Sequence, residues 1–278
     1  MKLKINYSLM SFTVIVVIMG SCQKQIDQPS KLENIAAALS SNSLHGHLKQ
    51  TNTYTSDVAV KWMNMQIRIM STTAGIPNNA FARPFAYSGI ALYEAVAPGM
   101  PAYQSLVGQL NGLSGLPQTG HGFAYHWPSS ANAALAYINK QMFPTTSIAN
   151  KTAIDSLENA LNTQYQGQAD AGTIIRSTAF GKAVAQKIFE WAVTDGYLHV
   201  SDAYIPPTGL GLWVPTAPAF ANAITPYWGT LRTVVPGSGD NAQPGAPTSY
   251  STAPASAFYL MVKEVYDISQ TLTPAQRA

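Results

Sequence analysis

Apolar side chains recur every three or four residues along most of this chain, and this spacing restricts the chain to helices. Each segment begins and ends at residues that are typical of helix ends, namely serine, aspartate, proline or glycine. The segments run from Ser56 to near Thr73, Asn78 to Ala97, Ser129 or Ser130 to Phe143, Ser147 to about Tyr165, and Asp170 to Val193. No segment alternates apolar and polar residues as a strand would. The pattern therefore predicts an all-α protein built as a helical bundle.

The stretch from Tyr197 to Ser251 interrupts this pattern. It holds many of the 18 prolines and several of the 20 glycines, which a regular helix does not accommodate. It also contains Trp213, Phe220 and Trp228, which a disordered linker would rarely carry. We therefore expect a long, ordered, Pro/Gly-rich loop draped over the bundle. A sixth helix is expected to start at Pro254 and end near Gln270. Its inward-facing residues are expected to be Phe258, Met261, Val262, Val265 and Ile268.

The first 22 residues have the pattern of an export signal. Two lysines precede an apolar run from Leu9 to Met19, which is too short to span a hydrocarbon core of ~30 Å, so a cleaved signal is favoured over a retained anchor helix. The sequence Met19-Gly20-Ser21-Cys22 resembles the lipobox of bacterial lipoproteins. Residues 1–21 are thus expected to be a signal peptide, and Cys22, the single cysteine, the lipidation site.

Lipidation at Cys22 would make the mature protein a membrane-anchored lipoprotein, on the periplasmic side or at the cell surface. Residues 22–54 are largely polar and are expected to form a tether. His45 and His47 lie in it, but no carboxylates accompany them, so they are interpreted as solvated linker residues and not as a metal site. Residues 55–278 then make up the helical domain.

Charge and cysteine content exclude several classes of protein. Lysine and arginine number 16 against 13 acidic residues, a net charge of +3 with no basic cluster, so no nucleic-acid partner is expected. A single cysteine allows neither an internal disulfide nor a cysteine-based zinc site.

The sequence contains no familiar catalytic motif. G-x-S-x-G, H-E-x-x-H and the P-loop pattern are all absent. Five residues in the loops are of the types that can ligate a metal ion. Their spacing is only weak evidence for a metal site, and ordinary hydrogen bonds are the favoured interpretation. They are His121, His126, Asp195, His199 and Asp202. We assign no catalytic, cofactor-binding or metal-binding residue.

Three glutamates lie in the middle of apolar helical segments, at Glu94, Glu190 and Glu264. A buried carboxylate there would need a partner. We expect a structural pairing with an arginine, for which the candidates are Arg68, Arg83 and Arg176.

The order of four segments resembles the N-terminal half of vanadium-dependent haloperoxidases, which belong with the type-2 phosphatidic-acid-phosphatase superfamily; bacterial lipoprotein members look most similar. The segments are WMNMQIRIM, NNAFARPFAYSGIALYEAV, GLWVPTAPAFANAITPYWGTLRTVV and STAPASAFYLMVKEVYDISQTLTPAQRA. The resemblance implies a helical-bundle enzyme whose pocket binds vanadate or phosphate. Lys, Arg and Ser-Gly donors hold the oxyanion in such a pocket, and a His attacks phosphorus or ligates vanadium.

This chain departs from the family's three site motifs, K-x6-R-P, P-S-G-H and S-R-x5-H. Arg83-Pro84 has Ile76 in place of the lysine, and Ser88-Gly89 is followed by Ile90 in place of the histidine. No arginine has a histidine six residues later. In the family these motifs lie in the C-terminal half, so no catalytic residue is carried over to this chain.

Thr273 and Pro274 form a typical helix start, yet only Ala275 to Ala278 follow. Because so short a helix is marginal, we expect the chain to be truncated before the catalytic helices. The expected function is the N-terminal helical portion of an exported vanadium-dependent haloperoxidase or acid phosphatase homologue, inactive alone. Vanadate and a small-molecule substrate are implied only for the full-length domain. The alternative is a helical surface lipoprotein that binds glycans or peptides on the aromatic loop around Trp213, Tyr227 and Trp228.

Overall fold

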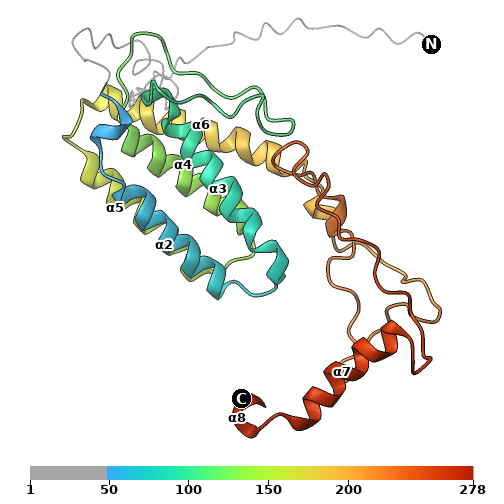
Figure 1. Ribbon diagram of the computed structural model, residues 1–278. Helices are drawn as coiled ribbons and strands as arrows, with labels where there is room; N and C mark the ends of the chain where they lie inside the picture. The colour runs from blue at the N-terminus through green and yellow to red at the C-terminus, as the bar shows by residue number, and fades with distance from the viewer. Residues whose placement is uncertain (1–48, 278) are drawn as a thin grey trace, which may run out of the picture.

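The computed structural model describes residues 49–277 of the chain (Figure 1). The expected signal peptide, Cys22 and nearly all of the tether lie outside these residues. The helices are α2 (Asp57–Thr72), α3 (Ala82–Val96), α4 (Trp127–Met142), α5 (Ile148–Tyr165), α6 (Ala171–Ala192), α7 (Ala257–Thr271) and α8 (Pro274–Arg277). Short 3₁₀ turns are η1 (Thr51–Thr53), η2 (Asn78–Ala80), η3 (Ala97–Gly99), η4 (Tyr197–His199) and η5 (Trp228–Thr230). Residues 49–277 contain no β-strand, so the all-α prediction is confirmed.

Helix caps explain most of the boundaries. Ser147 accepts a hydrogen bond from the Asn150 amide, and Asp170 accepts one from the Thr173 amide, as expected at N-caps. α4 begins two residues before its expected cap, because Pro128 occupies the first turn directly after His126. α7 likewise begins at Ala257, after the cap of Ser256, and not at Pro254.

The expected second helix is divided into three pieces. η2, α3 and η3 follow one another from Asn78 to Gly99, and Pro84 lies in the first turn of α3. Proline has no backbone N–H, but this costs nothing in the first turn, because the N–H groups there have no hydrogen-bond partner within the helix.

α4 is the centre of the bundle and contacts α2, α3, α5 and α6. Most of its residues are buried, including four alanines that let neighbouring helices approach. The approach to α6 is closest, where Gly181 lies against the backbone of Ser130. Large buried side chains from all five helices fill the core, among them Trp62, Ile69, Tyr87, Ile138, Ile154, Leu161 and Ile188.

After α6 the chain leaves the bundle as an arm that carries α7 (Figure 1). The inward-facing positions expected on α7 are exposed: Met261 by 49%, Val262 by 50%, Val265 by 68% and Ile268 by 53%. Phe258 is half-buried, with its ring centre 5.1 Å from that of Tyr250. For the other four positions the prediction is wrong, because within the described part of the chain no helix packs over this face of α7. The sequence pattern identifies an apolar face but not what covers it.

The loop between α6 and α7 covers the bundle at separate points along its length. Val200 and Thr225 are buried, and Val234 packs against the core. By contrast Trp213 is 49% exposed and Phe220 is 65% exposed. The loop is therefore draped over the bundle in part, and the rest of its apolar side chains face solvent. None of the helices within residues 49–277 is long and apolar enough to cross a membrane.

Candidate functional site

A buried carboxylate, Asp195, joins the end of α6 to α3. It accepts hydrogen bonds from Arg83 Nε at 2.7 Å, Arg83 Nη2 at 3.2 Å, Tyr87 Oη at 2.8 Å and the Tyr197 amide at 2.9 Å. Burial, together with the neighbouring Asp195, raises the pKa of Tyr87 to about 12. Arg83 was a candidate partner for a buried glutamate, and Asp195 was considered as a metal ligand, with ordinary hydrogen bonds as the favoured interpretation. The sequence pattern does not predict their pairing, because 112 residues separate them along the chain.

Arg232 fastens the loop to the same end of the bundle. Its amide donates to the Asp195 carbonyl at 2.9 Å, and its guanidinium donates to Thr194 Oγ1 at 2.7 Å and to the Trp191 carbonyl at 2.8 Å. The guanidinium also lies 4.6 Å from the centre of the Trp191 ring. The cluster therefore anchors the base of the arm.

The residues that match the haloperoxidase motifs only in part, Arg83 and Ser88, make structural contacts. Arg83 Nη2 also donates to the Ala192 carbonyl at 2.9 Å, and Ser88 is buried and accepts a hydrogen bond from Gln66 Nε2 at 2.9 Å. Vanadate is a tetrahedral oxyanion that needs several convergent donors. Because Ile76 and Ile90 offer none and Arg83 already binds Asp195, these residues do not fit a vanadate site.

Glu94 is buried, but its partner is not an arginine. Its carboxylate accepts hydrogen bonds from Ser105 Oγ at 2.9 Å and from the Leu106 amide. The arginine pairing expected from the sequence is therefore wrong for Glu94, because the loop after η3 supplies the donors. Glu190 is exposed and pairs with Lys187 at 2.6 Å, so it needs no buried partner. Glu264 is exposed as well.

The five residues considered as metal ligands are not brought together. Asp195 forms an ion pair with Arg83, and His199 Nδ1 lies 3.0 Å from Asp202 Oδ2 at the surface. His126 is buried next to Ser129, whereas His121 is exposed. Residues 49–277 contain no group of three or more His, Cys, Asp or Glu residues that could hold a metal.

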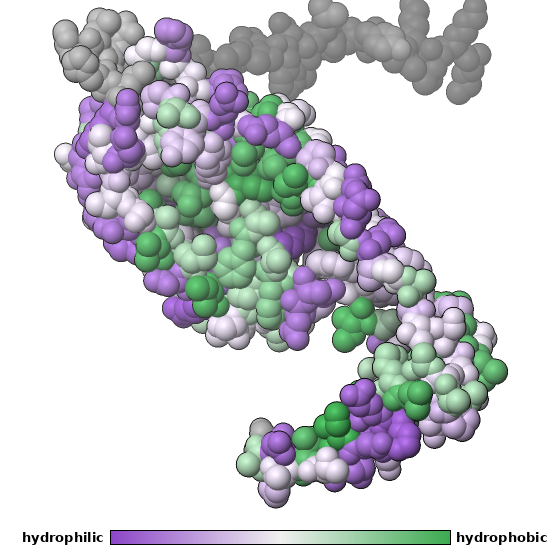
Figure 2. Space-filling model, in the orientation of Figure 1, coloured by the Kyte–Doolittle hydropathy of each residue, from purple (hydrophilic) through white to green (hydrophobic). Residues whose placement is uncertain are grey.

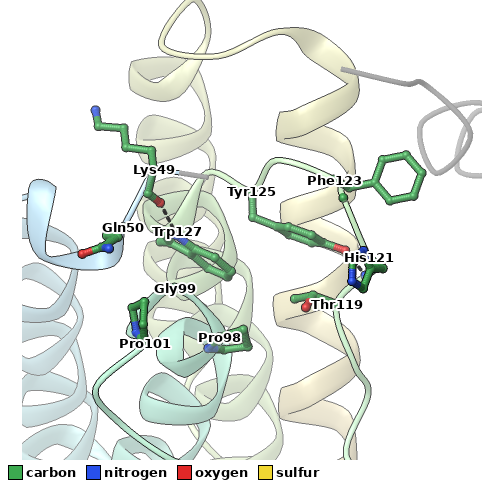
Figure 3. Close-up of a pocket in the computed structure, with 12 residues that line it drawn as sticks. Lys49, Gln50, Pro98, Gly99, Pro101, Thr119, His121, Phe123, Tyr125 and Trp127 are labelled. Carbon is green, nitrogen blue, oxygen red and sulfur yellow. Dashed lines mark hydrogen bonds between the residues drawn. The ribbon is translucent and has the colours of Figure 1, made fainter. Parts of the chain in front are cut away.

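The cavity in Figure 3, of about 360 Å³, lies between the chain at Lys49 and Gln50, η3 and the loop at 119–127. Trp127 and Tyr125 stack with ring centres 5.4 Å apart, and Trp127 Nε1 donates to the Lys49 carbonyl at 2.7 Å. The other side of Trp127 touches Gly99. In Figure 3 the side chain of Lys49 points away from the cavity. The aromatic rings are therefore used in internal packing, and the cavity presents little specific chemistry.

The aromatic residues expected to form a binding platform do not gather into one. Tyr227 Oη donates to the Ala203 carbonyl at 3.1 Å, and the Trp228 ring packs edge-on against Tyr197 with centres 6.4 Å apart. Trp213 makes no ring contact with another described aromatic residue, and it is half exposed. Tyr227 and Trp228 thus serve the packing of the loop itself.

The most extensive uncovered apolar surface belongs to the arm. Along α7, Phe258, Val262 and Val265 share one side, and Lys263 pairs with Asp267 at 2.6 Å on the other. Figure 2 shows apolar and polar patches next to each other on this part of the molecule. Monomeric proteins rarely leave such a surface uncovered. It is the strongest indication of an interaction surface in the described structure.

Comparison with solved structures supports the helical fold described above. No protein-family profile and no curated protein matches the chain. Among solved structures, a bacterial vanadium-dependent iodoperoxidase is similar, with a TM-score of 0.65 and 31% sequence identity. The match covers 78% of this chain and 51% of the iodoperoxidase, so the chain spans about half the length of that protein. The resemblance inferred from the sequence is confirmed at the level of the fold: this chain has the helical fold of the vanadium haloperoxidases.

Proposed function

We propose that this chain forms the helical N-terminal part of an exported enzyme related to vanadium-dependent haloperoxidases and acid phosphatases. The observation that carries the proposal is the likeness to the iodoperoxidase, at 31% identity over 78% of the chain. An iodoperoxidase oxidises iodide, and that activity belongs to the whole of that protein. For this chain, halide oxidation and phosphate-ester hydrolysis both stay open.

The uncovered face of the arm supports the same proposal. Burying a Val, Leu, Ile, Phe or Met side chain contributes about 1.5–3 kcal/mol, so a face with several of them gains stability when covered. We propose that the helices bearing the oxyanion pocket cover the α7 face. The part described here is then inactive alone, because Arg83 and Ser88 are held in structural contacts.

Vanadate or phosphate, and the small-molecule substrate, belong in this proposal to the other half of the domain. Arg83 and Ser88 are held in structural contacts and fit neither oxyanion, so in this proposal the described helices act as a scaffold. Their part is to hold the arm in place through the Asp195 cluster and to present α7 to the catalytic helices.

We further propose that the protein is lipidated at Cys22 and held at a membrane surface. The support is the short apolar run before Met19-Gly20-Ser21-Cys22. Several acyl chains give stable anchoring where one would not.

The first experiment measures the mass of the native protein in its own membrane fraction. An antibody raised against residues 147–164, most of which lie on α5, would detect it by immunoblot. We expect a band well above the 29.8 kDa of this chain. The immunopurified protein is then assayed for oxidation of iodide by hydrogen peroxide with and without orthovanadate, and for hydrolysis of p-nitrophenyl phosphate.

The control is the 278-residue chain made alone, which we expect to be inactive in both assays. A native band at or below 29.8 kDa together with no activity would overturn the proposal. The lipoprotein alternative would then be tested by glycan and peptide binding to the wild-type chain and to Trp213→Ala, at a residue that is 49% exposed, with circular dichroism to check that the variant is folded.

A further inference from the structure

His126 lies buried where four segments of the chain meet. Its Nδ1 is 2.8 Å from Ser129 Oγ in α4, and its Nε2 is 3.3 Å from Gln168 Oε1 in the turn between α5 and α6. Its amide donates to Ser177 Oγ in α6 at 2.7 Å. The fourth segment, residues 49–56, is here called the strap and includes η1. Tyr54 of the strap contacts the imidazole edge-on, with ring centres 5.1 Å apart.

The hydrogen bonds place one proton of His126 on Nε2. Gln168 Nε2 donates to the Gln164 carbonyl at 2.9 Å, so the oxygen of the same amide faces the imidazole and accepts from Nε2–H. In the neutral form Nδ1 accepts from the Ser129 hydroxyl. A second proton enters at Nδ1, and the Ser129 hydroxyl then has to turn from donor to acceptor.

The charges around the imidazole disfavour a second proton. Lys49 lies 4.1 Å above the Tyr54 ring, and Tyr165 borders the imidazole from the end of α5. On α6, Asp170 binds Thr173 and Arg176 binds the Ala124 carbonyl. On α2, Asp57 lines a cavity together with Tyr54, Tyr165 and Gln168, but within residues 49–277 no carboxylate forms a hydrogen bond or ion pair with His126. Burial lowers the pKa of His126, and the charge of Lys49 acts in the same direction.

The strap is a lightly held part of the cover over His126. None of its residues is buried, whereas Tyr165, on another side of the imidazole, is 4% exposed. Apart from the bond of the Val60 amide to the Ser56 carbonyl at the start of α2, two hydrogen bonds attach the strap to the bundle, from Trp127 Nε1 to the Lys49 carbonyl at 2.7 Å and from Thr51 Oγ1 to the Val96 carbonyl at 2.8 Å. Segments with few buried contacts open at the lowest free-energy cost. The strap also carries Lys49, the cation that a charged imidazole repels, so the cost of protonating His126 acts on the strap.

We propose that His126 makes the strap an acid-sensitive latch, closed on the bundle while the imidazole is neutral and lifted when the imidazole is protonated. Closure requires the neutral form, so the closed state is favoured above the ordinary histidine pKa of about 6.5 and is lost as the pH falls below it. The population of the open state is expected to rise by up to about tenfold per pH unit in that range. Opening would free the connection between the bundle and the N-terminal segment.

The test follows the indole N–H of Trp127, whose hydrogen bond to the strap breaks on opening. The full chain, labelled with ¹⁵N-tryptophan and held in mild detergent, is followed by NMR hydrogen exchange between pH 7.5 and 4.5. Rates are corrected for the intrinsic pH dependence of indole exchange. We expect the corrected Trp127 rate to rise up to tenfold per unit below about pH 6.5. Trp191, whose indole donates to the Asn111 carbonyl at 3.0 Å, is the internal control and should not respond.

Three variants test which residues cause the pH dependence. His126→Gln should abolish the pH dependence at Trp127. Lys49→Gln, at an exposed position, removes a charge that repels the protonated imidazole. It should raise the pKa of His126 in the closed state and so reduce the acid-dependent rise at Trp127, and it tests the latch even if His126→Gln fails to fold. His199→Gln, at a surface histidine, should behave as the wild type. The latch is overturned if Trp127 and Trp191 accelerate together, or if the Trp127 rate stays constant while the imidazole shifts of His126 show protonation.

Discussion

The close approach of α4 and α6 at Gly181 makes a quantitative prediction. A Cβ at this position would lie 2.6 Å from the carbonyl carbon and 2.8 Å from Cα of Ser130, and closer still to the Ser130 oxygen. All three are backbone atoms, so no change of rotamer relieves the clash, and the two helices have to move apart. Overpacking of this kind costs about 1–3 kcal/mol, and the higher helix propensity of alanine returns about 1 kcal/mol at most. We expect Gly181→Ala to lower the free energy of unfolding by about 2 kcal/mol.

Gly89 in α3 is the matched control. It is also a glycine in the middle of a helix, but a Cβ there meets nothing within 4 Å. Gly89→Ala should therefore stabilise the chain by about 0.5–1 kcal/mol. Urea unfolding followed by circular dichroism compares the midpoints of the two variants, with the slope expected to stay constant. A Gly181→Ala chain as stable as the wild type, or a Gly89→Ala chain equally destabilised, would refute the reasoning.

Four further predictions concern other parts of the chain. Arg83→Met strands the buried carboxylate of Asp195 and should cost about 3 kcal/mol in urea unfolding, much of it recovered by adding Asp195→Asn; no recovery would argue against the ion pair. Burial raises the pKa of Tyr165 to about 12, so stability should fall as the pH rises from about 10 towards 12, and Tyr165→Phe should flatten that fall in urea midpoints measured across this range. Val265→Glu, at a site 68% exposed, should change the unfolding free energy of this chain by less than about 0.5 kcal/mol; a larger loss would mean that α7 is covered. Cys22→Ala should move the protein from the membrane fraction to the soluble fraction on immunoblots, and retention in the membrane would contradict lipid anchoring.

Local patterns predict the helices of the bundle well. The caps at Ser147 and Asp170 are present as expected, and the short helix α8 begins at Pro274. These features depend on hydrogen bonds between residues three or four positions apart, which a sequence displays directly. α4 begins two residues earlier than predicted, because His126-Trp127-Pro128 can also begin a helix, with the proline in the first turn.

The candidate site is much less predictable. The partner of Arg83 is 112 residues away, and the partners of Glu94 lie in a loop without a pattern of its own. From the sequence, ordinary hydrogen bonds were the favoured interpretation of His126 over a metal site, but its partners were not predictable. Four separate segments contribute its surroundings, and their burial of the imidazole lowers its pKa.

The sequence by itself determined the all-α class, the approximate helices, the departure from the haloperoxidase motifs and the resemblance to that family, since these depend on local spacing and on segment order. Only the tertiary structure decided that Arg83 binds Asp195, that α4 and α6 meet at Gly181 and that the apolar face of α7 is uncovered. The reason is physical: hydrophobic periodicity shows that a face is apolar, but burial is a property of whatever packs against it.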